Sequence, residues 1–127
     1  MHIRTEIKQH MRSLDRAGGS PSADFVFPGA FTGFSGHFPG QPVLPGVCFI
    51  EAAVALLEAW HGREATVRQV SNAKFSRMVL PDQPVALRCV KFTNDDHGGR
   101  AAIVCEHDGA KAAEFVLDYD LVRDVKS

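Results

Sequence analysis

Near the start of the chain, hydrophobic residues recur at the spacing of an α-helix. They stand at steps of four, four and three, with charged residues between them. This pattern predicts an amphipathic helix within residues 1–18, ended by the Gly-Gly-Ser-Pro segment that begins at position 18. A short strand is predicted next, over residues 24–28, where it stops at a proline. The helical hydrophobic positions are Ile3, Ile7, Met11 and Leu14.

The longest strongly apolar stretch spans residues 43–57, and the segment of residues 47–61 predicts the central helix of the fold. Pro45 precedes it and Gly62 follows it, as is typical of helix ends. Apolar residues occur around nearly its whole circumference, so we expect a surrounding sheet to bury it on all sides. A charged residue interrupts the segment, and its length is too short to cross a bilayer, so no membrane role is expected.

Four strand-like segments follow the helix, separated by turn-forming residues. Asp108-Gly109 between the last two is a strong signal for a two-residue hairpin, and the last segment alternates apolar and polar residues. We therefore expect an antiparallel meander of four strands around one central helix, in a single α+β domain covering residues 1–127. The predicted strands span residues 66–75, 85–93, 100–107 and 110–121.

Composition is that of an ordinary globular domain. The 127 residues include 14 Lys+Arg and 15 Asp+Glu, a formal net charge of -1, which offers no positive surface for nucleic acid. The 3 cysteines show neither CxxC spacing nor an even count, so we expect small buried thiols in a reducing compartment. The N-terminal segment mixes charges and lacks the apolar core of a signal peptide, which makes the cytoplasm the expected location.

Glycine and proline are concentrated in residues 28–46, which contain four of the 7 prolines and five of the 11 glycines. No regular element fits that composition, so a long, stiff loop is predicted. His37 lies within it, and three further prolines restrict the backbone between His37 and the central helix. At the end of the loop, the Gly46 N–H stands at the positive end of the helix, where it can hold a ligand carbonyl oxygen.

Glu51 is the only ionisable residue between His37 and Glu58, and it lies one turn into an otherwise apolar helix. An unpaired carboxylate in apolar surroundings is costly, and its protonated form is favoured there, which makes Glu51 a candidate proton donor. Alternatively, it faces a gap in the sheet or caps a neighbouring amide. Glu58 lies near the helix end, where a solvated side chain is expected, and His61 and His107 are assigned to the surface.

A base, an acid and an oxyanion donor within one short stretch suit elimination or addition beside a thioester carbonyl. The run His37-Phe-Pro-Gly-Gln-Pro-Val-Leu-Pro-Gly46, followed by Glu51-Ala52, resembles the signature of the β-hydroxyacyl-acyl-carrier-protein dehydratases of the FabA/FabZ type. Weaker similarity extends over residues 23–121, as in a short, divergent member. One departure is Ala55, which stands where many members have a glutamine one turn after the acid.

This resemblance implies a hot-dog fold, a curled antiparallel sheet around a central helix, and a dimer formed by pairing of sheet edges. A trimer of dimers and a heterodimer with a related subunit are the alternatives. It implies dehydration of a (3R)-3-hydroxyacyl thioester on acyl carrier protein to the trans-2-enoyl thioester, without a metal or dissociable cofactor. His37 would deprotonate the α-carbon, Glu51 of the other subunit would protonate the departing β-hydroxyl, and the Gly46 amide would hold the thioester oxygen. Apolar side chains expected to line the acyl tunnel are Phe34, Phe38, Val47 and those of residues 75–79.

Two other functions remain open. One is a hot-dog thioesterase in which Glu51 activates water, and the other is a non-catalytic partner subunit of the same fold, which Ala55 favours. The complete loop from His37 to Gly46 argues against the thioesterase, because hydrolysis requires no base for an α-proton. The departures from the family pattern make a specialised acyl pathway, such as aryl-polyene or polyketide synthesis, at least as well supported as primary fatty-acid synthesis.

Overall fold

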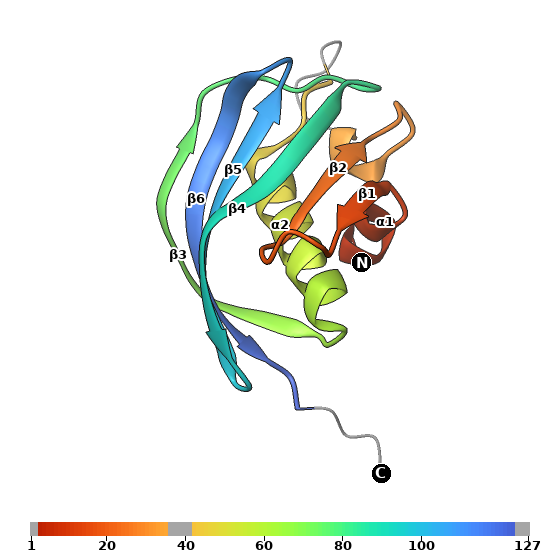
Figure 1. Cartoon of the computed structure of the whole chain (residues 1–127). Helices are drawn as coiled ribbons and strands as arrows, with labels where there is room; N and C mark the ends of the chain where they lie inside the picture. The colour runs from red at the N-terminus through yellow and green to blue at the C-terminus, as the bar shows by residue number, and fades with distance from the viewer. Residues whose placement is uncertain (1–2, 36–41, 124–127) are drawn as a thin grey trace.

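The computed structural model describes residues 3–35 and 42–123, in which a six-stranded antiparallel sheet curls around one long helix (Figure 1). A second, shorter helix lies against the side of the long helix that the curled sheet leaves open. Within these ranges, no helix is long and apolar enough to cross a membrane. The elements are α1 (Ile3–Lys8), β1 (Met11–Asp15), β2 (Ser22–Val26), the 3-10 helix η1 (Thr32–Phe34), α2 (Gly46–His61), β3 (Ala65–Phe75), β4 (Pro84–Asp95), β5 (Gly98–His107) and β6 (Ala110–Leu121).

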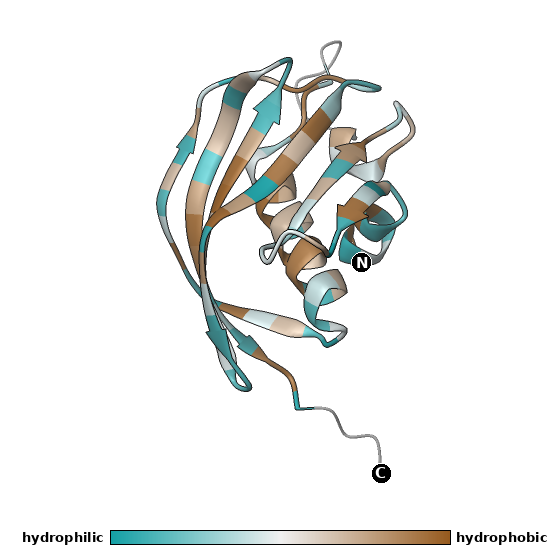
Figure 2. Ribbon diagram, in the orientation of Figure 1, coloured by the Kyte–Doolittle hydropathy of each residue, from teal (hydrophilic) through white to brown (hydrophobic). Residues whose placement is uncertain are grey.

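The central helix α2 begins directly after Pro45 and ends at Gly62, close to the predicted bounds. Gly62 adopts a φ of 69°, and its N–H donates a 2.8 Å hydrogen bond to the carbonyl of Glu58, an arrangement that terminates helices. Residues 52–58 are buried, and Figure 2 shows hydrophobic positions along α2 and on the strands that curl around it. The first turn differs, because Val47 is 60% exposed. The prediction of burial on all sides is therefore wrong at this end of the helix.

Strands β4, β5 and β6 form an antiparallel meander. The predicted hairpin at Asp108-Gly109 is confirmed, since His107 pairs with Ala110 and both turn residues have positive φ. However, β3 pairs with β6 and lies at the edge of the sheet, whereas β4 pairs with β2 and β5. The prediction of a four-strand meander is wrong, because the connection after β3 crosses the sheet instead of forming a hairpin.

The N-terminal segment contains a helix and a strand. α1 ends at Lys8 in a turn closed by backbone hydrogen bonds of 3.1 and 2.9 Å, and β1 then pairs with β2. The predicted helix within residues 1–18 is therefore wrong after Lys8. Met11 and Leu14 still pack against the core, but from a strand. The next strand is confirmed, although it spans Ser22–Val26 and stops before the proline.

The cysteines are free and buried, as predicted. Burial raises the pKa of Cys48 and of Cys89 to about 11, and the charges of Glu51 and Glu6 add to the effect on Cys48. Because a thiol with so high a pKa stays neutral at physiological pH, these side chains act as small hydrophobic residues. Burial also raises the pKa of Cys105.

Candidate active site

The N-terminus of α2 is an open end of the helix bordered by apolar side chains. Gly46 is its first residue, and a Cβ at this position would approach the ring of Phe75 to 3.1 Å, so the ring lies directly against the glycine. Val47 and Phe75 are both exposed. Amide N–H groups in the first turn of a helix have no intrahelical acceptor, and they stand at the positive end of its dipole. This end of α2 can therefore accept a ligand oxygen beside an apolar surface.

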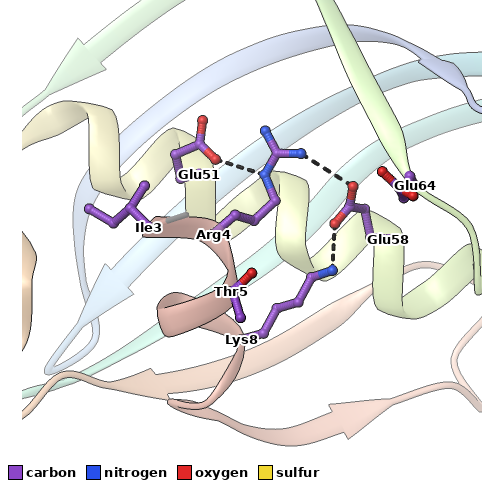
Figure 3. Close-up of a pocket in the computed structure, with 7 residues that line it drawn as sticks. All are labelled: Ile3, Arg4, Thr5, Lys8, Glu51, Glu58 and Glu64. Atoms are coloured by element: carbon purple, nitrogen blue, oxygen red, sulfur yellow. Dashed lines mark hydrogen bonds and ion pairs between the residues drawn. The ribbon is translucent and has the colours of Figure 1, made fainter. Parts of the chain in front are cut away.

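Glu51 lies one turn further along the helix face that carries Val47. Its side chain is 23% exposed, and its Oε1 accepts a 2.7 Å hydrogen bond from the Nε of Arg4 in α1. Figure 3 shows the second oxygen of Glu51 pointing away from Arg4. The alternative that Glu51 faces a gap in the sheet fits the structure, because the carboxylate pairs with Arg4 of α1 on the side of α2 that the sheet leaves open. Within the described residues it caps no amide. In the part of the chain that the structure describes, one of its oxygens accepts a hydrogen bond and the other has no partner.

Glu58 lies two turns after Glu51 and is held at every side-chain oxygen. Its Oε2 accepts hydrogen bonds from Arg4 Nη1 at 3.2 Å and from the Ala65 N–H at 2.8 Å, and its Oε1 pairs with Lys8 Nζ at 2.7 Å. Its side chain is only 5% exposed, so the prediction of a solvated residue is wrong. The physical reason is that α1 and the start of β3 cover this part of the helix. Glu58 therefore connects three elements.

Arg4 links the two carboxylates across an open pocket of about 610 Å³ (Figure 3). Burial acts to lower the pKa of Arg4, but hydrogen bonds and charges from Glu51 and then Glu58 outweigh it and raise the pKa. Most of the lining side chains are charged, so the pocket does not suit an acyl chain. Arg4 was not predicted from the sequence. The available signal was a pair of cations on one face of α1, Arg4 and Lys8, matched by two acids on one face of α2.

The remaining predicted site residues precede α2. His37 and Phe38 lie outside the described residues. Phe34 is buried in the core cluster and is not part of the exposed surface at the helix N-terminus. The Thr32 N–H at the start of η1 donates a 3.0 Å hydrogen bond to the Glu6 carboxylate. The short helix α1 therefore contacts both η1 and α2.

Two histidines lie away from this end of α2. His61, in the last turn of α2, has its Nε2 2.9 Å from the Tyr119 hydroxyl. Burial, followed by the charge of Arg63, lowers the pKa of His61, and burial raises that of Tyr119. His107 is buried, and its Nδ1 donates a 2.7 Å hydrogen bond to a backbone carbonyl, so its assignment to the surface is wrong. Both histidines have structural partners.

Comparisons with known proteins identify the family of the chain. The chain matches the family model of the ApeI-like dehydratases over residues 14–113. It is 39% identical over 93 residues to the 3-hydroxyacyl-[acyl-carrier-protein] dehydratase FabZ of Latilactobacillus sakei, a match that covers 68% of this chain and 66% of that protein. The FabZ of Clostridium acetobutylicum is 32% identical over 96 residues, covering 70% of this chain and 68% of that protein. The chain thus spans 66% and 68% of the lengths of these relatives.

Solved structures show the same fold. The dehydratase heterocomplex ApeI:P from Xenorhabdus doucetiae aligns with a TM-score of 0.69 at 18% identity, covering 87% of this chain and 96% of that one. The putative thioesterase yhdA from Lactococcus lactis aligns with a TM-score of 0.67 at 12% identity, covering 97% and 100%. The predicted hot-dog fold is confirmed, and the sequence is similar to those of FabZ-type dehydratases. The chain belongs to the ApeI-like dehydratase family.

Proposed function

We propose that this chain dehydrates a (3R)-3-hydroxyacyl thioester on acyl carrier protein to the trans-2-enoyl thioester. The observation that carries this proposal is the position of Glu51, one turn after the exposed Val47 in the first turn of α2 and with one carboxylate oxygen that has no partner among residues 3–35 and 42–123. The exposed side chains of Val47 and Phe75 beside Gly46 offer an apolar surface for the acyl chain. Family membership and the two FabZ relatives support the same reaction.

In the proposed reaction, His37 removes a proton from the α-carbon of the substrate. The electron pair of that C–H bond moves toward the thioester carbonyl, whose developing negative charge the Gly46 N–H stabilises. When the electron pair forms the α,β double bond, the β-hydroxyl departs with its bonding pair, and Glu51 protonates it to water. One proton is taken and one is given, so no redox partner is needed. Neither a metal nor a dissociable cofactor takes part.

The proposed site is shared between two copies of the chain, with His37 of one copy facing Glu51 of the other. The sheet supports such an assembly, because β3 ends the strand order and offers a free edge for pairing. Phe75, in the last position of β3, lies beside the open end of α2, so a partner at this edge would cover the site. A homodimer is the simplest form, and a trimer of dimers or a heterodimer with a related subunit would keep the same edge contact.

The substrate belongs to fatty-acid synthesis or to a specialised pathway such as aryl-polyene or polyketide synthesis. A panel of 3-hydroxyacyl-carrier-protein thioesters with saturated, polyunsaturated and aryl-terminated chains separates these contexts. The kcat/KM should be highest for the natural class, since the apolar contacts of a longer or flatter chain change the binding energy.

The deciding assay follows enoyl absorbance and free thiol together after adding a 3-hydroxyacyl-carrier-protein thioester. We expect enoyl product without thiol release. His37→Ala and Glu51→Gln should each lower kcat by about 10²- to 10⁴-fold, as is typical for loss of an acid or base. Glu64→Gln is the matched control, because Glu64 is an exposed acid that lines the same pocket and has no role in the proposed step.

The other outcomes identify the competing functions. Thiol release without enoyl product would indicate a thioesterase that uses Glu51 to activate water. If the chain by itself forms neither enoyl product nor free thiol, but activity appears when it is mixed with a related subunit, the chain is a non-catalytic partner. Full dehydration by His37→Ala would overturn the proposed mechanism. Sedimentation analysis of the same samples tests the assembly, since a monomer with full activity would contradict a shared site.

A further inference from the structure

The position of the Glu51 carboxylate is not explained by its own helix. Residues one turn before and after it on α2 are Val47, Cys48, Val54 and Ala55, and none of them makes a hydrogen bond to the carboxylate. Among the described residues, its hydrogen-bonding partner is Arg4, which comes from a different element 47 positions away. The orientation of Glu51 therefore depends on α1.

Arg4 is itself held in place by several contacts. Its guanidinium donates to Glu51 Oε1 at 2.7 Å, to Glu58 Oε2 at 3.2 Å and to the Ala65 carbonyl at 3.3 Å. A planar guanidinium bonded in three directions keeps a fixed position, which a flexible ammonium does not. Its Nε–H therefore reaches Glu51 from a defined direction.

The helix that carries Arg4 is also anchored. Ile7 is buried in the core, Lys8 pairs with Glu58 at 2.7 Å, and Glu6 accepts the 3.0 Å hydrogen bond from Thr32. These contacts fix α1 relative to α2 and to η1. Because α1 is packed in place, Arg4 fixes the position of Glu51, whose second carboxylate oxygen has no partner among the described residues.

We propose that Arg4 is the positioning residue for Glu51 in the reaction proposed above, on which this inference rests. In the protonated form of Glu51 that the reaction requires, the Arg4 Nε–H still donates to Oε1, so that Oε2 is the oxygen that presents the proton to the departing hydroxyl. When that proton leaves, the negative charge that appears on the carboxylate faces the guanidinium, which stabilises it. Arg4 acts through Glu51 and does not contact the substrate.

The test compares Arg4→Met with Lys8→Met in the full chain. Both substitutions remove a cation from α1 and a partner of Glu58, but only Arg4 contacts Glu51. We expect Arg4→Met to lower kcat by about 10- to 100-fold with little change in KM, which is the cost of a misplaced reacting group. Lys8→Met removes one of the contacts that anchor α1 but keeps the bond between Arg4 and Glu51, so it should lower kcat less than Arg4→Met does, by at most about two- to threefold. Arg4→Lys keeps the positive charge but loses the planar guanidinium, so its kcat should lie between those of Arg4→Met and Lys8→Met.

Thermal unfolding of each variant separates positioning from loss of structure. If Arg4→Met lowers kcat while it melts no lower than Lys8→Met, the positioning role is supported. If the two variants lose equal activity, or if Arg4→Met keeps full kcat, the inference is overturned. Failure of the proposed function gives a different result, because the wild type itself would then form no enoyl product.

Discussion

The two ends of α2 are built differently although they belong to one helix. Glu51 and Glu58 lie seven residues apart, and therefore on nearly the same face, yet Glu58 has three partners and Glu51 has one among the described residues. The side chain of Glu58 is 5% exposed and that of Glu51 is 23% exposed. A carboxylate with every oxygen bonded stabilises the fold. Glu51, with one oxygen that has no partner in the described part of the chain, is available for chemistry.

The difference has a geometric cause. α1 is only six residues long, and its ion pairs with α2 run from Glu51 to Glu58, so Val47 in the first turn stays exposed although Cys48 and Phe49 beside it are buried. Further along the helix, α1 and the start of β3 cover Glu58. The same sequence element thus provides both the core of the domain and the open part of its candidate site.

The largest expected difference between the two parts of α2 is in the free energy of unfolding when a hydrophobic side chain is shortened. Leu57→Ala empties space in the buried part of α2 and should lower the free energy of unfolding by about 2–5 kcal/mol. Val47→Ala removes atoms at an exposed position and should change it by less than about 0.5 kcal/mol. Urea unfolding measures the change in the free energy of unfolding for each variant, provided that the variants unfold with the same m-value. Equal losses would show that the first turn is covered in solution and that the contrast between the ends does not hold.

The two carboxylates give the next largest difference. Glu58→Ala leaves the buried N–H of Ala65 without its acceptor and removes a partner from both Arg4 and Lys8, so it should cost about 1–3 kcal/mol. Glu51→Ala breaks one half-exposed ion pair and should cost less than about 1 kcal/mol. The measurement is the shift in urea midpoint. A larger loss for Glu51→Ala would mean that Glu51, and not Glu58, is the carboxylate that holds α1 and α2 together.

Much of this architecture could be predicted from local patterns. The central helix follows from its hydrophobic run between Pro45 and Gly62, and the β5–β6 hairpin follows from Asp108-Gly109, because both signals lie within the element itself. The predicted N-terminal helix is too long because Met11 and Leu14 fit a helical period as well as a strand. Only pairing with β2 decides between the two, and pairing is not a local property.

The candidate site divides in the same way. Glu51 and Gly46 can be predicted because each stands out in its own segment, as a charge in an apolar helix and as a glycine at a helix start. The role of Arg4 and the burial of Glu58 cannot, because both depend on α1 packing against α2 across about fifty residues of chain. A contact between distant segments leaves only a weak charge pattern in the sequence.

A smaller effect concerns the termination of α2. Gly62 adopts a φ of 69°, and a Cβ there would meet no atom within 4 Å, so Gly62→Ala adds backbone strain without a clash. The expected cost is about 1 kcal/mol. Gly29→Ala is the control, since that glycine also has open space around it but no positive φ. Thermal or urea unfolding should show a loss only at Gly62. If Gly62→Ala left the free energy of unfolding unchanged, the C-terminal end of α2 would be less rigid than its geometry indicates.

The smallest expected effect is a pH dependence at the same end. Burial, followed by the charge of Arg63, lowers the pKa of His61 below its usual 6.5, so the unfolded chain binds this proton more readily than the folded one. The contribution of His61 to stability is therefore complete above pH 6.5 and is lost as the pH falls below it. His61→Phe keeps an aromatic ring beside Phe92 and Tyr119 but cannot titrate. Urea midpoints between about pH 8 and pH 5 should show the wild type losing stability relative to this variant. If the difference in urea midpoint between the wild type and this variant stayed constant over that range, the folded chain would bind the His61 proton as readily as the unfolded chain does. The last turn of α2 would then not shield His61 from solvent.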